Sequence, residues 1–332
     1  MSNEAPAPAE VKAFTGQRRR EKRDVHGWVV LDKPIGMTST HAVSVVKRLF
    51  KARRAGHAGT LDPLASGLLP IALGEATKTV PFVMEGRKRY RFTVRWGEER
   101  DTDDAEGRVV ATSTERPTIA TIRGLLPTFT GTIAQVPPRY SAVKIDGERA
   151  YDLAREGEVV ELEPRPVDIH RLDLVEAAEG TDPDRSVFEA ECGKGTYVRA
   201  IARDMGRALG CYGHVVELRR TLVGPFGESD AVSVEALQEL AAGSPQPPTV
   251  GAPGAPLLPV EAGLAALPAL AVTRSDAARL ARGQAVLLRG RDAPVMSGCI
   301  AVLCQGSLLA LADVEKGELH PRRIFNFGQS HG

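Results

Sequence analysis

An aspartate in a glycine-rich loop is the most informative chemical feature of this 332-residue sequence. Asp62 lies between Gly56 and Gly67, with Leu61 directly before it and Pro63 directly after it. Glycines allow tight turns and close approach of another molecule, and the proline keeps Asp62 out of helical geometry. A carboxylate held in such a loop with little solvation can act as a nucleophile. An isolated Asp-Pro pair is more often a surface turn, so this candidate needs support from other residues.

Two further segments combine residues suited to recognition or catalysis. The segment 194–199 leaves a predicted strand and enters a predicted helix, so Tyr197 and Arg199 project to the same side if it is extended. A tyrosine ring can stack on a base, and an arginine can pair bidentately with a carboxylate. A core tyrosine beside a surface arginine is the alternative interpretation. The segment 33–39 forms a rigid turn between a strand and a helix, which alone is more often a simple connector.

The composition is that of a globular protein with about two domains, since 42% of residues are apolar and 26% are charged. The formal net charge is only +1, yet basic residues gather in runs at 18–23, 47–54 and 87–95. Such runs can bind a phosphate backbone, although each one alone is more often a solvated surface. Their closeness to one candidate site favours a polyanionic partner.

Several other classes of function lack their signatures. The cysteines form no C-x-x-C pair and have no histidines at zinc spacing, so we expect no structural metal. The acidic stretch 101–107 matches a calcium loop only at its first two ligands. The sequence has no Walker loop and no G-x-S-x-G elbow. Without a signal peptide or a membrane-spanning apolar run, it predicts a cytoplasmic protein with reduced thiols and no membrane partner.

Apolar periodicity predicts strands and helices that intermix irregularly, which favours an α+β domain with a mixed sheet. A helix capped by Thr38-Ser39-Thr40 is expected to run to about Phe50. In the strand 89–96, Tyr90 and every second residue after it face one side, and mostly basic residues face the other. The other strands are expected at 27–32, 68–73, 131–136, 166–175, 186–192 and 214–223, and the other helices at 75–84, 118–126, 148–156, 199–209 and 233–241.

Composition divides the chain into four parts. Residues 1–24 read as a disordered basic tail, and residues 25–241 hold the candidate site. The stretch 242–258 is rich in proline, glycine and alanine, which indicates a linker or an insertion. Short strand-like runs at 286–288, 300–303 and 307–311 predict a small β-rich second domain over 259–327.

Five segments in order resemble the TruB family of tRNA pseudouridine synthases. They are the strand 27–32 with K-P-x-G-x-T-S at 33–39, G-H-x-G-x-L-D-P-x-A-x-G at 56–67, K-x-Y at 88–90, K-G-T-Y-x-R at 194–199, and H-V-x-x-L-R-R at 214–220. The resemblance covers about 26–241 and resumes from Leu257 to Arg323. The tail 1–24 and the stretch 242–256 depart from the pattern without disturbing a motif.

The resemblance implies a pseudouridine synthase catalytic domain and a PUA-type RNA-binding domain at the carboxy terminus. The implied reaction is isomerisation of the uridine at tRNA position 55, in the T loop, without a metal or cofactor. The implied partner is tRNA, bound through its T arm. We expect a monomer that requires no protein partner.

The resemblance assigns catalysis to Asp62, Tyr90 and Arg199. The target nucleotide is flipped out at a cost of a few kcal/mol, and stacking on Tyr90 recovers about 1–3 kcal/mol. Asp62 then attacks either C6 of uracil or C1′ of the sugar, and the sequence does not decide between them. Uracil detaches, rotates and rejoins through C5, and Tyr90 is a candidate for removing the C5 proton. Arg199 keeps Asp62 ionised against the cost of desolvation.

The resemblance also implies a set of substrate-binding residues. Tyr197 lines the target base opposite Tyr90, and Leu218 closes the apolar wall. His57 fills the space that the flipped base leaves in the RNA loop. Asp104 and Lys33 are further polar candidates for contact with the substrate.

Three other functions compete with this hypothesis. An RNA chaperone would use the same surfaces, and it is compatible with catalysis, but a pure binder has no need for a buried acid in an RNA-facing cleft. A guide-RNA-dependent synthase fits poorly with the compact length and the absence of long lysine-rich tails. A metabolic enzyme for small molecules fits poorly with the basic runs and the β-rich second domain.

Overall fold

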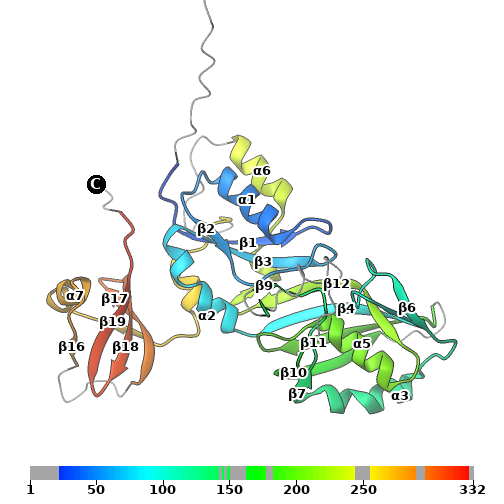
Figure 1. Ribbon diagram of the computed structural model, residues 1–332. Helices are drawn as coiled ribbons and strands as arrows, with labels where there is room; N and C mark the ends of the chain where they lie inside the picture. Colours follow the sequence, from blue (N-terminus) through cyan, green and yellow to red (C-terminus); the bar gives the residue numbers. More distant parts are fainter. Residues whose placement is uncertain are drawn as a thin grey trace, which may run out of the picture.

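The computed structural model describes residues 22–141, 144–145, 148–149, 162–176, 182–243, 255–288 and 296–328 (Figure 1). Two bodies are visible, a larger one built on a ten-stranded sheet and a smaller one built on a five-stranded sheet. Both contain helices beside their strands. The predicted α+β class and the β-rich second domain are therefore confirmed.

The large sheet mixes parallel and antiparallel strand pairs. Its order is β14-β1-β3-β12-β4-β11-β10-β7, while β13 pairs with β12 and β2 pairs with β3 off this path. The β3–β12 and β1–β14 pairs are parallel, and the remaining pairs are antiparallel. The strands are β1 (Gly27–Lys33), β2 (Ala55–His57), β3 (Ser66–Leu73), β4 (Lys88–Trp96), β7 (Gly131–Gln135), β10 (Arg165–Glu176), β11 (Arg185–Cys192), β12 (Gly213–Val223), β13 (Phe226–Gly227) and β14 (Ala231–Val232).

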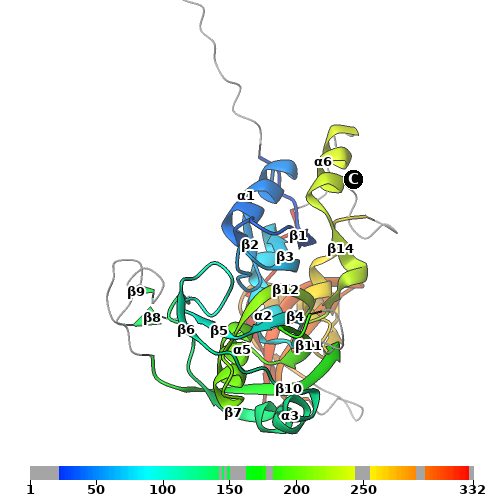
Figure 2. The same ribbon diagram turned by 90° about the vertical axis from the view of Figure 1, so that its right-hand side faces the viewer.

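Helices cover this sheet at its two ends (Figure 2). Helix α1 (Ser39–Leu49) and helix α6 (Val234–Gly243) pack together at one end, and α5 (Val198–Ala208) packs on β12 and β4. The Thr38 hydroxyl caps α1 by accepting from the His41 N–H, as the sequence predicts. The smaller elements are η1 (Gly74–Lys78), α2 (Val80–Glu85), β5 (Glu98–Arg100), β6 (Val109–Thr112), α3 (Ile119–Leu125), η2 (Leu126–Phe129), β8 (Lys144–Ile145), β9 (Glu148–Arg149) and η3 (Glu228–Asp230).

Two predicted helices differ in the structure. The helix expected at 75–84 is divided into η1 and α2, because Pro81 lies in the first turn of α2 and proline is tolerated at a helix start but not inside one. The helix expected at 148–156 is contradicted at its start, where Glu148 and Arg149 form strand β9. Residues 150–156 lie outside the described part of the chain.

The predicted tail ends earlier than expected. Residues 1–21 lie outside the described part, but Arg23 already pairs with the segment after α1. Its N–H donates to the Lys51 carbonyl at 2.8 Å, and its carbonyl accepts from the Arg53 N–H at 3.3 Å. The buried Val25 side chain follows within the main core. The ordered chain therefore includes at least part of the segment predicted as a tail.

The predicted linker 242–258 is also too long. Leu258 exchanges two backbone hydrogen bonds of 2.8 Å with Trp28 of β1, and Leu257 is buried in the main core. The next turn, η4 (Val260–Leu264), packs so closely on Trp28 that a Cβ at Gly263 would lie 2.5 Å from the indole nitrogen. The chain from Leu257 to η4 thus belongs to the large body, because its apolar side chains complete that body's core.

The small body begins at β15 rather than at 259. Its strands have the order β15-β17-β18-β19-β16, and helix α7 packs on β18 and β19. The elements are β15 (Ala269–Ala271), α7 (Arg274–Ala281), β16 (Val286–Leu287), β17 (Gly298–Cys304), β18 (Ser307–Glu315) and β19 (Glu318–Ile324). The three predicted strands are confirmed, whereas β15, α7 and β19 were not predicted. The PUA-type assignment of this body stays a prediction.

The chain after β19 fastens the small body to the large one. Lys78 Nζ donates to the Ile324 carbonyl at 2.8 Å and to Glu75 Oε2 at 2.6 Å, and the Asn326 N–H donates to the same carboxylate oxygen at 2.7 Å. Phe325 is buried in an apolar cluster that also contains residues of β1 and β3. These contacts fix the two bodies to each other at this point.

Candidate active site

The Asp62 loop lies where the large sheet divides. One edge of β3 pairs with β1 along Gly67–Leu73. On its other edge, β3 pairs with β12 only at Ser66 and Gly67, and with β2 at Ile71–Leu73. The loop that carries Asp62 joins β2 to β3 beside this gap. The division of the sheet therefore makes room for a loop at the centre of the body rather than at its rim.

Side-chain and backbone hydrogen bonds hold the loop on both sides of Asp62. The Ser39 hydroxyl accepts from the Leu61 N–H and donates to the Leu61 carbonyl, both at 2.9 Å. The Gly36 N–H donates to the Pro63 carbonyl at 2.7 Å. Because both neighbours of Asp62 are fixed, its carboxylate has a defined direction before any substrate arrives.

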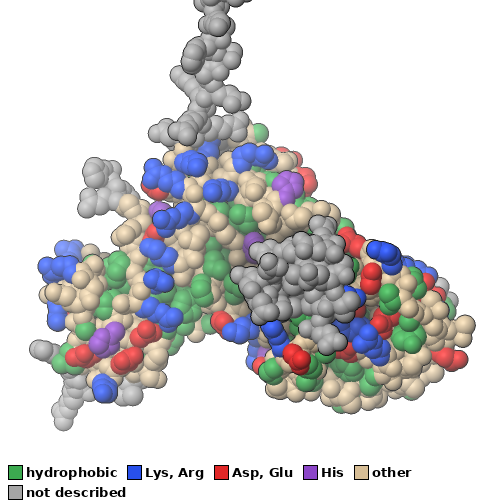
Figure 3. Space-filling model, in the orientation of Figure 1, with side chains coloured by type: hydrophobic (Ala, Val, Ile, Leu, Met, Phe, Trp, Pro, Cys, Tyr) green, Lys and Arg blue, Asp and Glu red, His purple; other side chains and the backbone are tan. Residues whose placement is uncertain are grey.

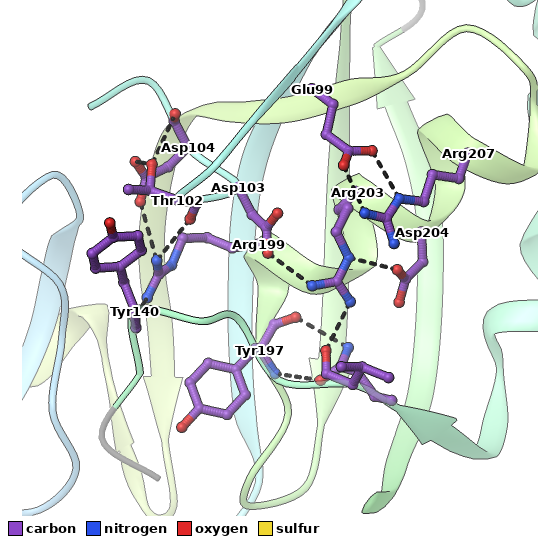
Figure 4. A network of polar contacts seen from close by, with 12 residues as sticks. Glu99, Thr102, Asp103, Asp104, Tyr140, Tyr197, Arg199, Arg203, Asp204 and Arg207 are labelled. Atoms are coloured by element: carbon purple, nitrogen blue, oxygen red, sulfur yellow. Dashed lines mark hydrogen bonds and ion pairs between the residues drawn. The ribbon is translucent and has the colours of Figure 1, made fainter. Parts of the chain in front are cut away.

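Asp62 forms an ion pair with Arg199, as predicted. The distance from Arg199 Nε to Asp62 Oδ2 is 3.0 Å, and the side chains are 6% and 35% exposed. Arg199 Nη1 donates to the Thr102 carbonyl at 2.9 Å and lies 3.2 Å from Asp104 Oδ2, while Nη2 donates to the Tyr140 carbonyl at 3.0 Å (Figure 4). Asp62 is therefore the more accessible member of a pair whose cation is fixed on several sides.

Arg199 is the first of three arginines on one face of α5. The arginines recur at every fourth residue, and each meets a carboxylate from the segment 99–104 (Figure 4). The pairs are Arg199–Asp104 at 3.2 Å, Arg203–Asp103 at 2.9 Å and Arg207–Glu99 at 2.6 Å. Burial decreases along the row, since the Arg207 side chain is 54% exposed. The row ties the helix to the acidic segment and orients Arg199.

Tyr197 precedes α5 and is held by a buried amide. Its N–H donates to Gln135 Oε1 at 2.9 Å, and Gln135 Nε2 donates to its carbonyl at 3.1 Å (Figure 4). Burial raises the pKa of the half-buried Tyr197 phenol. The ring is therefore a neutral aromatic surface at neutral pH.

Tyr90 and Leu218 lie on neighbouring strands near Asp62. Leu218 pairs with Phe92 and Arg220 pairs with Tyr90 in the β12–β4 register, so these four side chains share one face of the sheet. Leu218 is buried in the core and Tyr90 packs against it. Burial raises the pKa of Tyr90, whereas the nearby Arg220 cation lowers it. The face beside Asp62 is thus apolar and aromatic with one buried cation.

His57 ends β2 and is half buried. Within the described residues, its Nδ1 is enclosed and has no hydrogen-bond partner. Burial lowers the pKa of His57, and the Arg220 cation lowers it further. The imidazole is therefore neutral at neutral pH, which suits a space-filling role better than a charged contact.

Lys33 and Asp104, which were predicted as substrate contacts, are both buried. The Lys33 side chain is fully buried, and its Nζ donates to the Pro34 and Met37 carbonyls at 2.9 Å each. Burial lowers the pKa of Lys33 to about 8, with the Asp62 charge opposing the shift. Asp104 is also buried and is occupied by Arg199. Neither offers an exposed polar group in this structure, and their contact with the substrate stays a prediction.

The sequence analysis gave no role to several residues that hold this site, namely Ser39, Gln135, Arg203 and Arg220. The arginine spacing on α5 opposite an acidic run was a usable signal, because i, i+4 residues share a helix face. Ser39 was noticed only as part of a helix cap. Nothing in the sequence marks Gln135, which is one polar residue at the end of a strand.

In the part of the chain that the structure covers, no three His, Cys, Asp or Glu side chains converge in a manner that would hold a metal ion. None of the helices there has both the length and the apolar character needed to cross a membrane.

The sequence matches two family models in succession. Residues 47–198 match the N-terminal domain of TruB family pseudouridylate synthase, and residues 199–265 match the tRNA pseudouridylate synthase B C-terminal domain. The boundary falls at the start of α5, inside the large body. Both matched segments therefore contribute strands to the same sheet and residues to the same site.

Curated relatives are similar over nearly the whole chain. The tRNA pseudouridine synthase B of Rhodopseudomonas palustris is 70% identical over 326 residues, covering 98% of this chain and 87% of the relative. The protein of the same name from Bradyrhizobium diazoefficiens is 70% identical over 312 residues, covering 93% of this chain and 88% of the relative.

Solved structures of Cbf5 share the fold. The chain matches a Cbf5-Nop10-Gar1 complex with a TM-score of 0.67 and 24% identity, covering 91% of this chain and 85% of the other. An archaeal box H/ACA sRNP Nop10-Cbf5 complex gives a TM-score of 0.66 and 23% identity, covering 90% and 85%. At this identity the likeness concerns the arrangement of the chain.

Proposed function

The chain belongs to the TruB family of pseudouridylate synthases, and from this premise we propose that it isomerises uridine to pseudouridine at position 55 in the T loop of tRNA. The observation that carries the proposal is the Asp62–Arg199 pair at 3.0 Å on a loop fixed on both sides of Asp62. An accessible carboxylate paired with an almost enclosed guanidinium is suited to nucleophilic attack in a closed site.

The reaction begins when the target uridine leaves the T loop and enters the pocket. Tyr90 and Tyr197 provide aromatic faces for the base, and Leu218 supplies an apolar wall. His57 is neutral and half buried, so it can occupy the place that the base vacates without bringing an uncompensated charge into the RNA. These residues recover part of the cost of unstacking the base.

Asp62 then attacks, at either C6 of uracil or C1′ of ribose. The bond between C1′ and N1 breaks, the ring rotates, and C5 bonds to C1′. The bond between Asp62 and the substrate then breaks, which restores the free carboxylate. The C5 proton leaves and N1 ends with a proton, so the atoms of substrate and product are the same. The Arg199 guanidinium, 3.0 Å from the Asp62 carboxylate, pairs with its negative charge while the base excludes water from the site.

Tyr90 is our candidate for removing the C5 proton. Burial raises the pKa of its phenol, so the residue is protonated at neutral pH and becomes a base only when its own proton is passed on. The neighbouring Arg220 cation favours the ionised form. A phenol that faces the base beside this cation therefore fits both stacking and proton transfer.

Opening a T loop to extract a base also changes the fold of the RNA. We therefore propose a second activity, tRNA folding, that uses the same binding surfaces without the chemistry of Asp62. Protein partners are not needed for either activity in this proposal, and we propose that the chain acts as a cytoplasmic monomer.

The test of the proposed reaction uses a T-arm RNA with a single uridine at position 55, tritiated at C5. Wild-type protein is expected to release the tritium to water, and mass mapping is expected to find pseudouridine at that nucleotide. The matched control carries its only labelled uridine at another T-loop position. Equal release from both RNAs would refute the choice of position 55.

The small body is proposed to add RNA affinity rather than chemistry, since every residue of the site lies before β13. Lys and Arg side chains form a line down the face where the two bodies meet (Figure 3). Exposed basic residues occur in both bodies, among them Arg53 and Arg54 after α1 and Arg322 and Arg323 in β19. Such residues bind phosphates without reading sequence.

A protein that ends at residue 267 keeps η4 but loses Phe325 from the apolar cluster that it shares with β1 and β3. We expect it to fold with a slightly lower melting temperature, bind tRNA more weakly and keep its single-turnover rate at saturating enzyme. A protein that ends at Gly243 is the informative comparison, because it also loses Leu257, which is buried in the main core, and Leu258, which exchanges backbone hydrogen bonds with Trp28. We expect it to melt at a clearly lower temperature. Melting curves, filter binding and single-turnover assays check both forms. A folded 267-residue protein without activity would contradict the proposed division of roles.

A further inference from the structure

Arg220 is a buried cation beneath the Asp62 loop, and the reaction as described gives it no direct part. Its side chain is among the largest that are fully buried, with 2% of the residue exposed. It lies at the last residue of β12 that pairs with β3, opposite Gly67. Its neighbour Arg219 points to the other face of the strand, where it binds Asp32 and Glu228. Two adjacent arginines thus have very different surroundings.

The Arg220 guanidinium replaces backbone pairing where the sheet divides. Nε donates to the Leu68 carbonyl at 2.8 Å, just beyond the last β3–β12 pair. Nη1 and Nη2 donate to the Thr60 and Gly59 carbonyls at 3.2 Å each. One side chain therefore connects strand β3 to the two loop residues that lie just before Leu61.

The backbones of β3 and β12 approach so closely at Gly67 and Arg220 that no side chain fits at residue 67. Gly67 has a φ of +99°, and a Cβ there would lie 2.3 Å from the Arg220 carbonyl oxygen and 2.8 Å from its nitrogen. Gly59, whose carbonyl Arg220 binds, has a φ of +96°. Both values require glycine or impose strain. The close approach of β12 to β3 and the loop is what brings the guanidinium within reach of the carbonyls.

The hydrogen-bond acceptors of Arg220 are unusual for a buried cation. The three hydrogen bonds of the Arg220 guanidinium described above all end on carbonyl oxygens. In the ranges that the structure describes, no ion pair joins Arg220 to a carboxylate. Burying a cation without a carboxylate costs more than burying an ion pair or an apolar side chain. Retaining such a cation is explained if its position serves the site rather than the stability of the fold.

On the basis of the proposed function, we propose that Arg220 is a positioning residue of the reaction: by holding the Gly59 and Thr60 carbonyls it fixes the direction of Asp62 toward the target uridine. The Ser39 hydroxyl holds the next residue, Leu61, by bonding to its N–H and to its carbonyl. Asp62 follows Leu61 directly. A displacement of the carbonyls of residues 59 and 60 would therefore also displace the Asp62 carboxylate. A displacement of about 1 Å at a reacting group is enough to lower a rate roughly 100-fold.

The charge of Arg220 supports the same assignment. It lowers the pKa values of Tyr90, His57 and Lys33, which places the cation close to each of these residues of the site. For Tyr90 the shift favours the phenolate, and for His57 it favours the neutral ring. Arg220 therefore influences both the geometry of the site and the protonation of its residues, although it does not contact the substrate in this proposal.

The test compares Arg220→Lys with Arg219→Lys. Lysine keeps the charge, but a single ammonium cannot reproduce the planar fork that reaches three carbonyls. Arg220→Lys is expected to lower the single-turnover rate roughly 10- to 100-fold at unchanged tRNA affinity, whereas Arg219→Lys stays near wild type. Hydrogen exchange of the free protein is expected to increase at residues 58–65 only in Arg220→Lys. Arg220→Met, which buries no charge, repeats the comparison if the lysine variant does not fold.

An Arg220 variant that is folded and as fast as Arg219→Lys would overturn the proposal. So would a loss of tRNA affinity that accounts for the whole loss of rate, because Arg220 would then act in binding. The proposed function fails in a different way, through a wild-type protein that makes no pseudouridine or through an active Asp62→Asn variant. The exchange measurement is independent of both, since it needs neither RNA nor activity.

Discussion

Asp62→Asn should reduce pseudouridine formation at least about 10⁴-fold while leaving tRNA affinity unchanged. Asparagine keeps the size of the side chain and its hydrogen-bonding reach, so the loop held by Ser39 and Gly36 should keep its shape. What is lost is the negative charge and the nucleophilic oxygen. The ion pair with Arg199 Nε at 3.0 Å becomes a hydrogen bond from the guanidinium cation to a neutral amide oxygen. The loop carries no other carboxylate that could replace Asp62.

Asp32→Asn is the matched control for this substitution. Asp32 also pairs with an arginine, Arg219, at 3.0 Å, and its side chain is 34% exposed, against 35% for Asp62. The two variants therefore remove the same charge from similar surroundings, but only one of them lies on the candidate catalytic loop. Asp32→Asn should keep the wild-type rate. Filter binding and pseudouridine mapping on the same preparations measure affinity and conversion together.

The outcome also separates catalysis from RNA folding. If Asp62→Asn still promotes refolding of a denatured tRNA but forms no pseudouridine, the two proposed activities use the same surface and only one of them uses Asp62. An Asp62→Asn variant that converts uridine near the wild-type rate would mean that the loop is a surface turn and that the active site lies elsewhere.

Much of the large sheet follows directly from patterns in the sequence. The alternation in β4 places Phe92, Val94 and Trp96 in the core, with Arg91 and Arg95 exposed. Continuous apolar runs such as β3 are correctly predicted as buried strands, because a central strand is covered on both faces. The same logic failed at the carboxy-terminal side, where Leu257 and Leu258 were assigned to a linker from their proline- and glycine-rich neighbours. Two apolar residues are too few to show periodicity.

The site was harder to predict than the fold, because its residues come from distant parts of the chain. Asp62 and Arg199 could be paired beforehand only through the family resemblance, since spacing alone says nothing about residues on separate elements. Lys33 and Asp104 were expected to contact substrate only as polar candidates that came with the family resemblance. In the structure carbonyl oxygens enclose the lysine and Arg199 occupies the aspartate, so both are buried. Burial of a paired charge depends on tertiary contacts that a sequence pattern does not contain.

The three arginines of α5 offer a graded test of the ion-pair network. Arg199→Lys should lower the conversion rate about 100-fold, because lysine keeps the charge but loses the fork that reaches Asp62 and Asp104 together. Arg203 binds Asp103 and the Val136 carbonyl but not Asp62, so Arg203→Lys should cost about 1–3 kcal/mol of stability with a smaller effect on rate. Arg207→Lys should change neither, because the Arg207 side chain is 54% exposed.

The order of the effects on rate, rather than any single value, decides between two explanations. If Arg199 matters because it orients Asp62 and pairs with its charge, only Arg199→Lys should lose most of the rate. The loss of stability in the three variants should then follow the burial of each arginine along the helix. If the row only fastens α5 to the acidic segment 99–104, the rate and the melting temperature should fall together in all three variants. Single-turnover rates and thermal melts of the three proteins distinguish these outcomes. A normal rate in Arg199→Lys would mean that a positive charge at residue 199 is sufficient and that the guanidinium fork is not needed to orient Asp62.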